Sequence, residues 1–515
     1  MRLAAALAAS LALAACSGGG SGNSGVNVVP PPGNAGSVAS ASKLSIAGIG
    51  DSLTAGTQSG GTMGASIPGP LGSIPGVGVI APPPVGVPAT QENGFFSLLW
   101  QQANGVNLAF MSNPATSPLP LLKPPGVGGL LAPTSTHIFP APVSNTCDAN
   151  QIPANQFSTA LSLRLNPALN PWDVAIPGAT AHEALFMVGA TGDCGINPAN
   201  APPTFVALNS LVNGESQNFW PILGGFGQGV TQVEAAKSLH AQVATVWLGS
   251  NDLLKPAFSG GLAPVTAPQS MHDDIKSIIL QLQGAGSKVA VANLVDVMGA
   301  ATFIPQPAYQ PTLQAYITGV LIAQGVPPAQ AQAAAVLYST AYAGQETAQA
   351  GLGPNGYFTI NALFKTLQTA AAQIPAHALP VAPTLSGGDF IADAVANNVK
   401  ALNAAYNVAI GQAASETGAA LVDVHALFVS IAAAGGAPIN PPKCCSLVYR
   451  GGLSSLDGLH PSNTGYALIA NAFIAQLNTS YNLGIPAVNV GAVYATDPYA
   501  PGNGVSGFSV LRSPR

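Results

Sequence analysis

The chain places a small hydroxyl residue directly after a short buried-strand pattern, in Gly50-Asp51-Ser52-Leu53. The preceding residues, 43–49, have the apolar character and the length of a strand in a parallel sheet. Glycine at position 50 lets the backbone turn sharply, and α/β folds carry their sites at the carboxyl ends of such strands. Ser52 is therefore well placed to be a nucleophile, which needs a base for its proton and donors for an oxyanion.

A base and two donors follow in chain order. The base is His460, in Asp457-Gly458-Leu459-His460-Pro461, and one tight turn can bring the Asp457 carboxylate to its imidazole. That contact would fix the tautomer and stabilise the imidazolium. Gly178 and Asn251 each follow a strand-like run. They offer a backbone N–H and a side-chain amide to an oxyanion.

These blocks resemble those of the SGNH hydrolases, also called GDSL esterases and lipases. The Ser, Gly, Asn and His blocks of that family match Ser52, Gly178, Asn251 and His460, and its Asp three residues before the His matches Asp457. The resemblance covers part of the chain, because the spacers are longer than a minimal family domain needs.

The resemblance implies a three-layer α/β/α sandwich with a mostly parallel, flavodoxin-like central sheet. It also implies a serine ester hydrolase that needs no metal and no organic cofactor. Ser52, His460 and Asp457 would form the catalytic triad. The oxyanion would be held by the N–H groups of Ser52 and Gly178 and by the Asn251 amide.

Apolar runs alternate with helical patterns along the chain, which favours a parallel sheet between two layers of helices. Helical patterns cover residues 271–283 and 391–416, and a last helix is expected just behind His460. Core strands are predicted at residues 43–49, 173–176, 244–248, 288–294 and 420–425.

The predicted hydrolase domain covers residues 42–490 and contains two long insertions. The first, at about 57–171, is rich in Gly and Pro and is typical of an extended loop or cap. The second, at about 299–386, contains an Ala-rich stretch with helical spacing that a Gly-rich segment then breaks. Residues 491–515 are predicted to form a C-terminal tail.

The composition is sparsely charged. Asp, Glu, Lys and Arg make up 6% of the residues, against roughly 25% in typical soluble proteins. No apolar run reaches the roughly 20 residues that span a membrane, so we expect a water-soluble mature chain. The net charge of −5 provides no basic surface for nucleic acid. Such a chain suits neutral or apolar substrates.

The N-terminus predicts an extracytoplasmic bacterial lipoprotein. Residues 1–15 have the basic start and apolar stretch of a signal peptide. They lead into Leu13-Ala14-Ala15-Cys16, which resembles a lipobox with Cys16 as the lipidated residue. A Gly/Ser-rich linker, residues 17–41, would be a flexible tether. Ser17 after the cysteine suggests sorting to the outer membrane in a Gram-negative host. The alternative is an ordinary signal peptide with Cys16 incidental.

Four further cysteines invite disulfides in an oxidising compartment. Three pairings are possible. Adjacent Cα atoms lie only about 3.8 Å apart, which argues against a bond within the neighbouring pair. A metal site is the alternative, but the spacing lacks a CxxC motif. These residues are Cys147, Cys194, Cys444 and Cys445.

Other polar residues have plainer interpretations. Asp51 and Asp252 are expected to hold loop backbone through hydrogen bonds. His425 is expected on the last strand in a structural role, and His182 could line the cleft. Trp100 and Trp247 are expected in the core.

Low charge favours a carboxylesterase or lipase acting on small-molecule or lipid esters. The two insertions could equally frame a groove for acetylated polysaccharide, which would make the chain a deacetylase. A third alternative is a non-enzymatic surface lipoprotein that keeps the fold.

Overall fold

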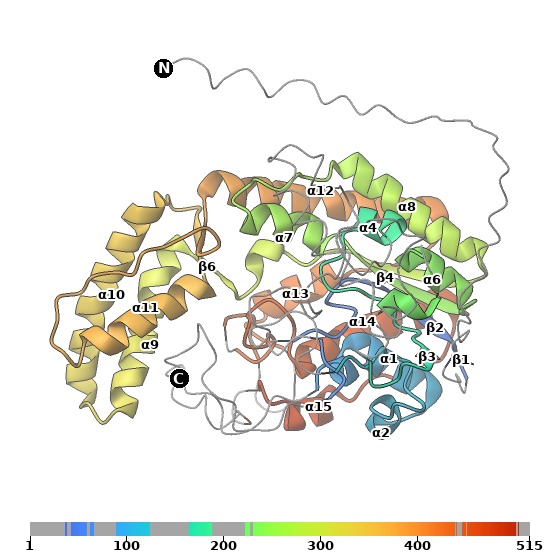
Figure 1. Cartoon of the computed structure of the whole chain (residues 1–515), viewed down its shortest axis with the longest axis horizontal. Helices are drawn as coiled ribbons and strands as arrows, with labels where there is room; N and C mark the ends of the chain where they lie inside the picture. The colour runs from blue at the N-terminus through green and yellow to red at the C-terminus, as the bar shows by residue number, and fades with distance from the viewer. Residues whose placement is uncertain are drawn as a thin grey trace, which may run out of the picture. The chain divides into compact units, whose positions relative to one another are not determined.

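In a computed structural model of the chain, four parallel strands form the central sheet in the order β2-β4-β5-β9 (Figure 1). Residues 172–176 run parallel to β2, where the Gly48 N–H donates to Trp172 O at 2.9 Å. With that segment included, the order by sequence is 2-1-3-4-5, as in flavodoxin-like folds. The predicted mostly parallel sheet is confirmed. Its strands are β2 (Ile46–Gly50), β4 (Val243–Trp247), β5 (Lys288–Ala292) and β9 (Ala420–Val422).

The structure describes residues 37–38, 43–58, 62–65, 89–123, 164–187, 222–226, 230–437, 439, 445–449, 451–500 and 503. The signal peptide, Cys16 and most of the linker lie outside these residues, as do Cys147, Cys194 and Cys444. Cys445 is disulfide-bonded, and the pairing of the four cysteines stays a prediction. Two short strands, β1 (Ser37–Val38) and β3 (Leu169–Asn170), form a separate parallel pair.

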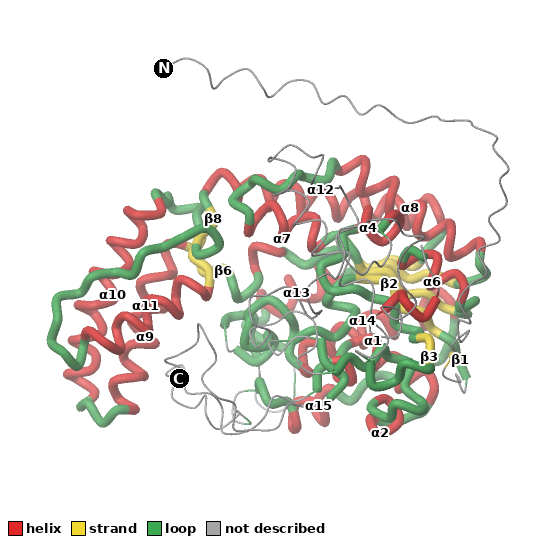
Figure 2. The backbone as a smooth tube through the Cα atoms, in the orientation of Figure 1, coloured by secondary structure: helices red, strands yellow, loops and turns green. Residues whose placement is uncertain are grey.

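Helices cover both faces of the central sheet (Figures 1 and 2). On one face, α1 (Phe95–Asn104) packs on α14 (Asn463–Tyr481), and Phe95 stacks on Phe473 with ring centroids 4.7 Å apart. The other face carries α6 (Gln232–Ser238), α8 (Pro268–Gly284) and α12 (Asp393–Thr417). The three-layer α/β/α sandwich follows, with Trp100 and Trp247 buried in its core as predicted.

Shorter helices connect these layers. Among the described residues, no helix is both long and apolar enough to cross a membrane. The connecting helices are α2 (Leu108–Met111), α4 (Ala181–Phe186), α7 (Ser250–Phe258), α13 (Val424–Ala433) and α15 (Val490–Thr496), with 3-10 turns η1 (Gln91–Asn93), η3 (Gly224–Phe226) and η4 (Val297–Gly299).

The first predicted insertion includes part of the core. Helix α1 lies within it, and Phe95, Phe96 and Trp100 are at most 1% exposed in the main apolar cluster. The sequence pattern missed this helix because Gly and Pro dominate the residues on either side of it.

The last strand is shorter than predicted, so the placement of His425 on a strand is wrong. The Asp423 side chain accepts a hydrogen bond from the Ala426 N–H at 2.9 Å and caps α13. Because that cap starts a helix, β9 ends at Val422 and His425 lies in the first turn of α13.

The chain also remains structured beyond residue 490. Helix α15 packs on α14. The buried Asp497 carboxylate accepts hydrogen bonds from the Thr464 N–H and hydroxyl at 2.7 and 2.6 Å. Residues 490–497 thus join the domain that carries the site.

The second insertion, predicted at about 299–386, corresponds in the structure to the elements from residue 303 to 391, which we call the helical insertion. The predicted helices and their break are present, because α10 ends at Gly351 with a φ of 61°. The antiparallel sheet β6-β7-β8 adjoins them. An apolar cluster of its own includes Tyr309 stacked on Phe358 at 3.9 Å. Its elements are β6 (Phe303–Pro305), α9 (Gln306–Ala323), α10 (Pro328–Ala350), β7 (Tyr357–Thr359), α11 (Ile360–Gln373) and β8 (Phe390–Ile391).

A carboxyl group is buried inside the helical insertion. Glu346 on α10 is fully buried, and its Oε1 accepts a hydrogen bond from the Thr366 hydroxyl on α11. Burial raises the pKa of Glu346 from 4.5 to about 7. The folded state therefore holds a proton that the unfolded state has lost, and stability falls as the pH rises through this range.

Glu346→Gln should remove this pH dependence, because the amide stays neutral. Between pH 5 and 8 the wild-type Tm should fall more steeply than that of the variant. The full effect is on the order of 3 kcal/mol. Thermal melts of both proteins in matched buffers measure the difference. Parallel Tm–pH curves would show that Glu346 does not ionise in this range.

Candidate active site

The structure brings Ser52, His460 and Asp457 into one hydrogen-bonded row. His460 Nε2 lies 2.9 Å from Ser52 Oγ, and His460 Nδ1 lies 2.7 Å from Asp457 Oδ2. Ser52 follows β2 and the other two precede α14, so Ser52 and His460, 408 positions apart in sequence, meet at the carboxyl ends of the strands. The arrangement can pass a proton from the hydroxyl to the imidazole.

Asp457 is held as a carboxylate acceptor. Its Oδ1 receives hydrogen bonds from the N–H groups of Leu459 and His460, both at 2.9 Å, and from the Ser455 hydroxyl at 3.0 Å. Burial alone would raise the pKa of Asp457, but the charge of His460 and these hydrogen bonds outweigh it and hold the pKa below its ordinary value. An ionised Asp457 stabilises a positive charge on the imidazole.

Local sequence shapes the turn that carries Ser52. A Cβ at Gly50 would lie 2.0 Å from Thr54 Oγ1, so this position requires glycine. The Asp51 Oδ1 atom accepts the Leu53 N–H at 2.9 Å and closes the turn around Ser52. On the other side, Ser462 caps α14 and starts that helix directly behind His460.

The backbone N–H groups of Ser52 and Gly178 are the two backbone donors expected for an oxyanion. Within the described part of the chain, neither the Ser52 N–H nor the Gly178 N–H donates a hydrogen bond. Gly178 has a φ of 91°, and a Cβ there would meet no atom within 4 Å. Glycine therefore both permits this backbone conformation and leaves the space beside its N–H open.

Asn251 lies in the first turn of α7, at the carboxyl end of β4. Its Nδ2 donates to Ala179 O at 3.0 Å and to Asp51 Oδ2 at 3.2 Å. Both amide protons thus have acceptors in the resting structure. Donation to an oxyanion would require one of these hydrogen bonds to be shared or exchanged.

Asp51 has a larger part in the site than sequence reasoning gave it. It holds the Leu53 backbone as predicted, and it also links the Ser52 loop to Asn251. Burial raises its pKa to about 7, against the lowering effect of the Leu53 N–H and His460. The sequence offers two signals for this role, the position of Asp51 beside Ser52 and the amide side chain at Asn251. Neither signal reveals that the Asp51 and Asn251 side chains form a hydrogen bond.

The other candidates have hydrogen-bond partners outside the row of three. Asp252 holds the backbone, as predicted, because its Oδ2 accepts the Ala181 N–H at 3.1 Å and its Oδ1 accepts the Thr266 hydroxyl. His182 on α4 contacts Asp274 at 3.2 Å. His425 donates its backbone N–H to Asn293 at 3.0 Å.

Comparison with known proteins identifies a family. A family model for GDSL-like lipase/acylhydrolase matches residues 144–473. The match includes Gly178, Asn251, Asp457 and His460 and begins after Ser52. No curated protein and no solved structure matches the chain significantly. Because the family model covers more than half of the chain, the protein belongs to the GDSL-like lipase/acylhydrolase family, and it is a hydrolase of this general kind.

Proposed function

We propose that the protein is a serine ester hydrolase with Ser52 as nucleophile, His460 as general acid and base, and Asp457 as the group that orients His460. The observation that carries the proposal is the continuous hydrogen bonding from Ser52 Oγ through the imidazole to Asp457. It lies at the carboxyl ends of the parallel strands, next to the point where the strand order reverses, which is where open α/β sheets hold their ligands.

The reaction would proceed through an acyl-enzyme. Ser52 Oγ attacks the ester carbonyl carbon while His460 Nε2 takes the hydroxyl proton. The N–H groups of Ser52 and Gly178 and the Asn251 amide would stabilise the tetrahedral oxyanion. As the carbon–oxygen bond breaks, His460 returns the proton to the leaving alcohol. Water, deprotonated by His460, then attacks the acyl carbon and releases the acid and Ser52.

The helical insertion favours neutral or apolar esters. From residue 303 to 391 its Asp, Glu, Lys and Arg residues are Glu346, Lys365 and Asp389. Glu346 is buried, and Lys365 is 2.6 Å from Asp389. Large apolar side chains are exposed instead, at Ile322, Val336, Leu337, Leu379 and Val381. We therefore propose a carboxylesterase or lipase.

An ester panel tests this choice. Hydrolysis of p-nitrophenyl acetate, butyrate, octanoate and palmitate should rise beyond the acetyl ester, and acetate release from acetylated xylan should be slow. Preference for the acetyl ester together with rapid release from xylan would support the polysaccharide deacetylase instead. Failure to label with a fluorophosphonate, which needs an activated serine, would support a non-enzymatic protein.

The sequence of the N-terminus supports a further proposal, that Cys16 carries lipid and anchors the protein in the outer membrane. Cys16→Ser should abolish acylation and move the protein from the membrane fraction to the soluble fraction. Activity per molecule should stay near wild type, because a flexible Gly/Ser-rich linker would separate the anchor from the site. Fractionation with a high-salt wash measures this. A variant that stayed with the membrane would place the anchor elsewhere in the chain.

A further inference from the structure

We propose that Tyr449 is a positioning residue, through which the helical insertion holds the turn that carries Asp457 and His460. The inference rests on the proposed function of that turn. The Tyr449 hydroxyl donates to Leu456 O at 2.9 Å. Leu456 directly precedes Asp457, so this hydrogen bond fixes the backbone at the entrance to the turn.

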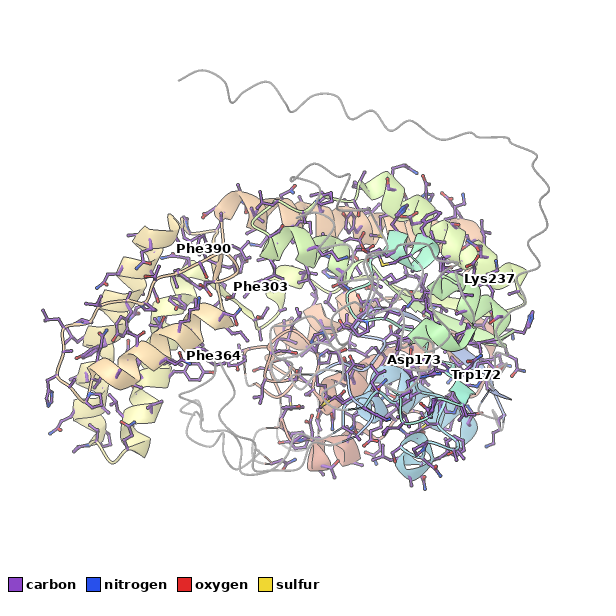
Figure 3. The ribbon with its side chains drawn as sticks, viewed as in Figure 1. Trp172, Asp173, Lys237, Phe303, Phe364 and Phe390 are labelled. Carbon is purple, nitrogen blue, oxygen red and sulfur yellow. The ribbon has the colours of Figure 1, made fainter. Side chains whose placement is uncertain are left out.

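The helical insertion fixes Tyr449 in its place. The Tyr449 ring meets Phe364 of α11 edge-on, with centroids 6.1 Å apart, and lies 6.4 Å from the Tyr316 ring of α9. Phe364 is 6% exposed and belongs to the apolar cluster of the insertion. Figure 3 labels this residue on α11. A shift of α9 or α11 would therefore move the phenol.

A second tie lies on the other side of Asp457. The Thr302 N–H, at the base of the helical insertion, donates to Gly458 O at 2.8 Å. Thr302 O in turn accepts the Ile360 N–H at the start of α11. Gly458 has a φ of 68°, and a Cβ there would lie 2.7 Å from Thr302 N. The glycine thus allows both the turn and the close approach. Two residues that the insertion holds, Tyr449 and Thr302, therefore bind backbone on both sides of Asp457.

The helical insertion also contacts the helix that carries Asn251. Phe258, the last residue of α7, packs against Phe303 of β6 with ring centroids 5.3 Å apart. Figure 3 labels Phe303. The helical insertion is therefore tied to the turn that carries His460 through Tyr449 and Thr302, and it contacts the helix that carries Asn251 directly. Since a displacement of about 1 Å in a reacting group can lower a rate about 10²-fold, these contacts bear on kcat.

Tyr449→Phe tests the proposal with the smallest change, because it removes the hydroxyl and keeps the ring between Phe364 and Tyr316. The variant should lower kcat about tenfold with KM nearly unchanged, and slow fluorophosphonate labelling of Ser52 by the same factor. Tyr338→Phe is the matched control, since the Tyr338 hydroxyl also donates to a backbone carbonyl, that of Ala378, within the insertion. Its kcat should stay within twofold of wild type.

A second variant asks whether the insertion acts through the phenol. Phe364→Leu should lower kcat severalfold, and the double variant with Tyr449→Phe should be no slower than the slower single variant, because both changes act on one contact. If Tyr449→Phe and Tyr338→Phe both keep the wild-type kcat and labelling rate, the phenol has a structural role alone and the proposal is wrong. If Tyr449→Phe is slow but the two effects multiply, the helical insertion does not act through Tyr449.

These outcomes are distinct from a failure of the proposed function. An inactive wild-type protein that no fluorophosphonate labels would overturn the hydrolase site itself. A slow Tyr449→Phe variant beside an active wild type and an active Tyr338→Phe variant isolates the positioning role.

Discussion

Ser52→Ala should lower ester turnover by about 10⁴- to 10⁶-fold while the protein stays folded. The hydroxyl is the atom that His460 Nε2 contacts at 2.9 Å, and Ser52 is only partly buried. Removing one oxygen there leaves the apolar core untouched, so the Tm should stay near wild type. Measured on a p-nitrophenyl ester, the loss should appear in kcat.

His460→Ala should show a loss of similar size, and the Ser52→Ala/His460→Ala variant should be little worse than either single change. Ser52 and His460 would act as one unit, so the first substitution already removes the contribution of both, and the second lowers the rate little further. A folded Ser52→Ala protein with wild-type turnover would place the nucleophile elsewhere. Two losses that multiply in the double variant would show that the residues act separately.

The sequence predicted the layers and the meeting of distant residues for a simple reason. Each residue of the proposed site directly follows a strand or precedes a helix, and the carboxyl ends of parallel strands meet at one edge. Ser52 after β2, Gly178 after residues 172–176 and Asn251 after β4 therefore converge wherever the sheet forms. Their catalytic roles remain predictions.

The contacts between these loops could not be read from the sequence. The Asn251–Asp51 hydrogen bond depends on the side-chain geometry of two loops, which no local pattern encodes. The hydrogen bonds that Thr302 and Tyr449 donate to the Asp457 turn are accepted by backbone carbonyl oxygens. Every residue type has such an oxygen, so the sequence does not mark these positions. Where a local signal existed, as in the Asp423 cap that ends β9, the strand pattern concealed it.

Asn251→Ala should lower kcat by about 10²- to 10³-fold, or about 3–4 kcal/mol of transition-state stabilisation, with little change in KM. The reason is that a hydrogen bond to the oxyanion strengthens as charge develops. Asn251→Asp should be at least as damaging, because a carboxylate there would repel the oxyanion and face Asp51.

The structure gives the competing explanation a definite form. Asn251 joins the Asp51 and Ala179 loops through both amide protons, so its loss should lower the Tm whether or not it contacts substrate. Stability alone therefore cannot decide between the two roles. The kcat of Asn251→Ala decides between them, provided that it is compared with the kcat of a neighbouring variant that has a similar effect on stability.

Asp252→Ala is that control. Asp252 is the next residue on α7, is buried to a similar degree, and also holds backbone of a neighbouring loop, at Ala181. Both variants should lose stability, but Asp252→Ala should keep kcat within about tenfold of wild type. Its carboxylate makes hydrogen bonds with Ala181 and Thr266 and affects the Ser52 loop through its charge on Asp51, without a hydrogen bond to that loop among the described residues. Equal losses of rate in the two variants would assign Asn251 to loop support, whereas a hundredfold gap between them would assign its amide to the transition state.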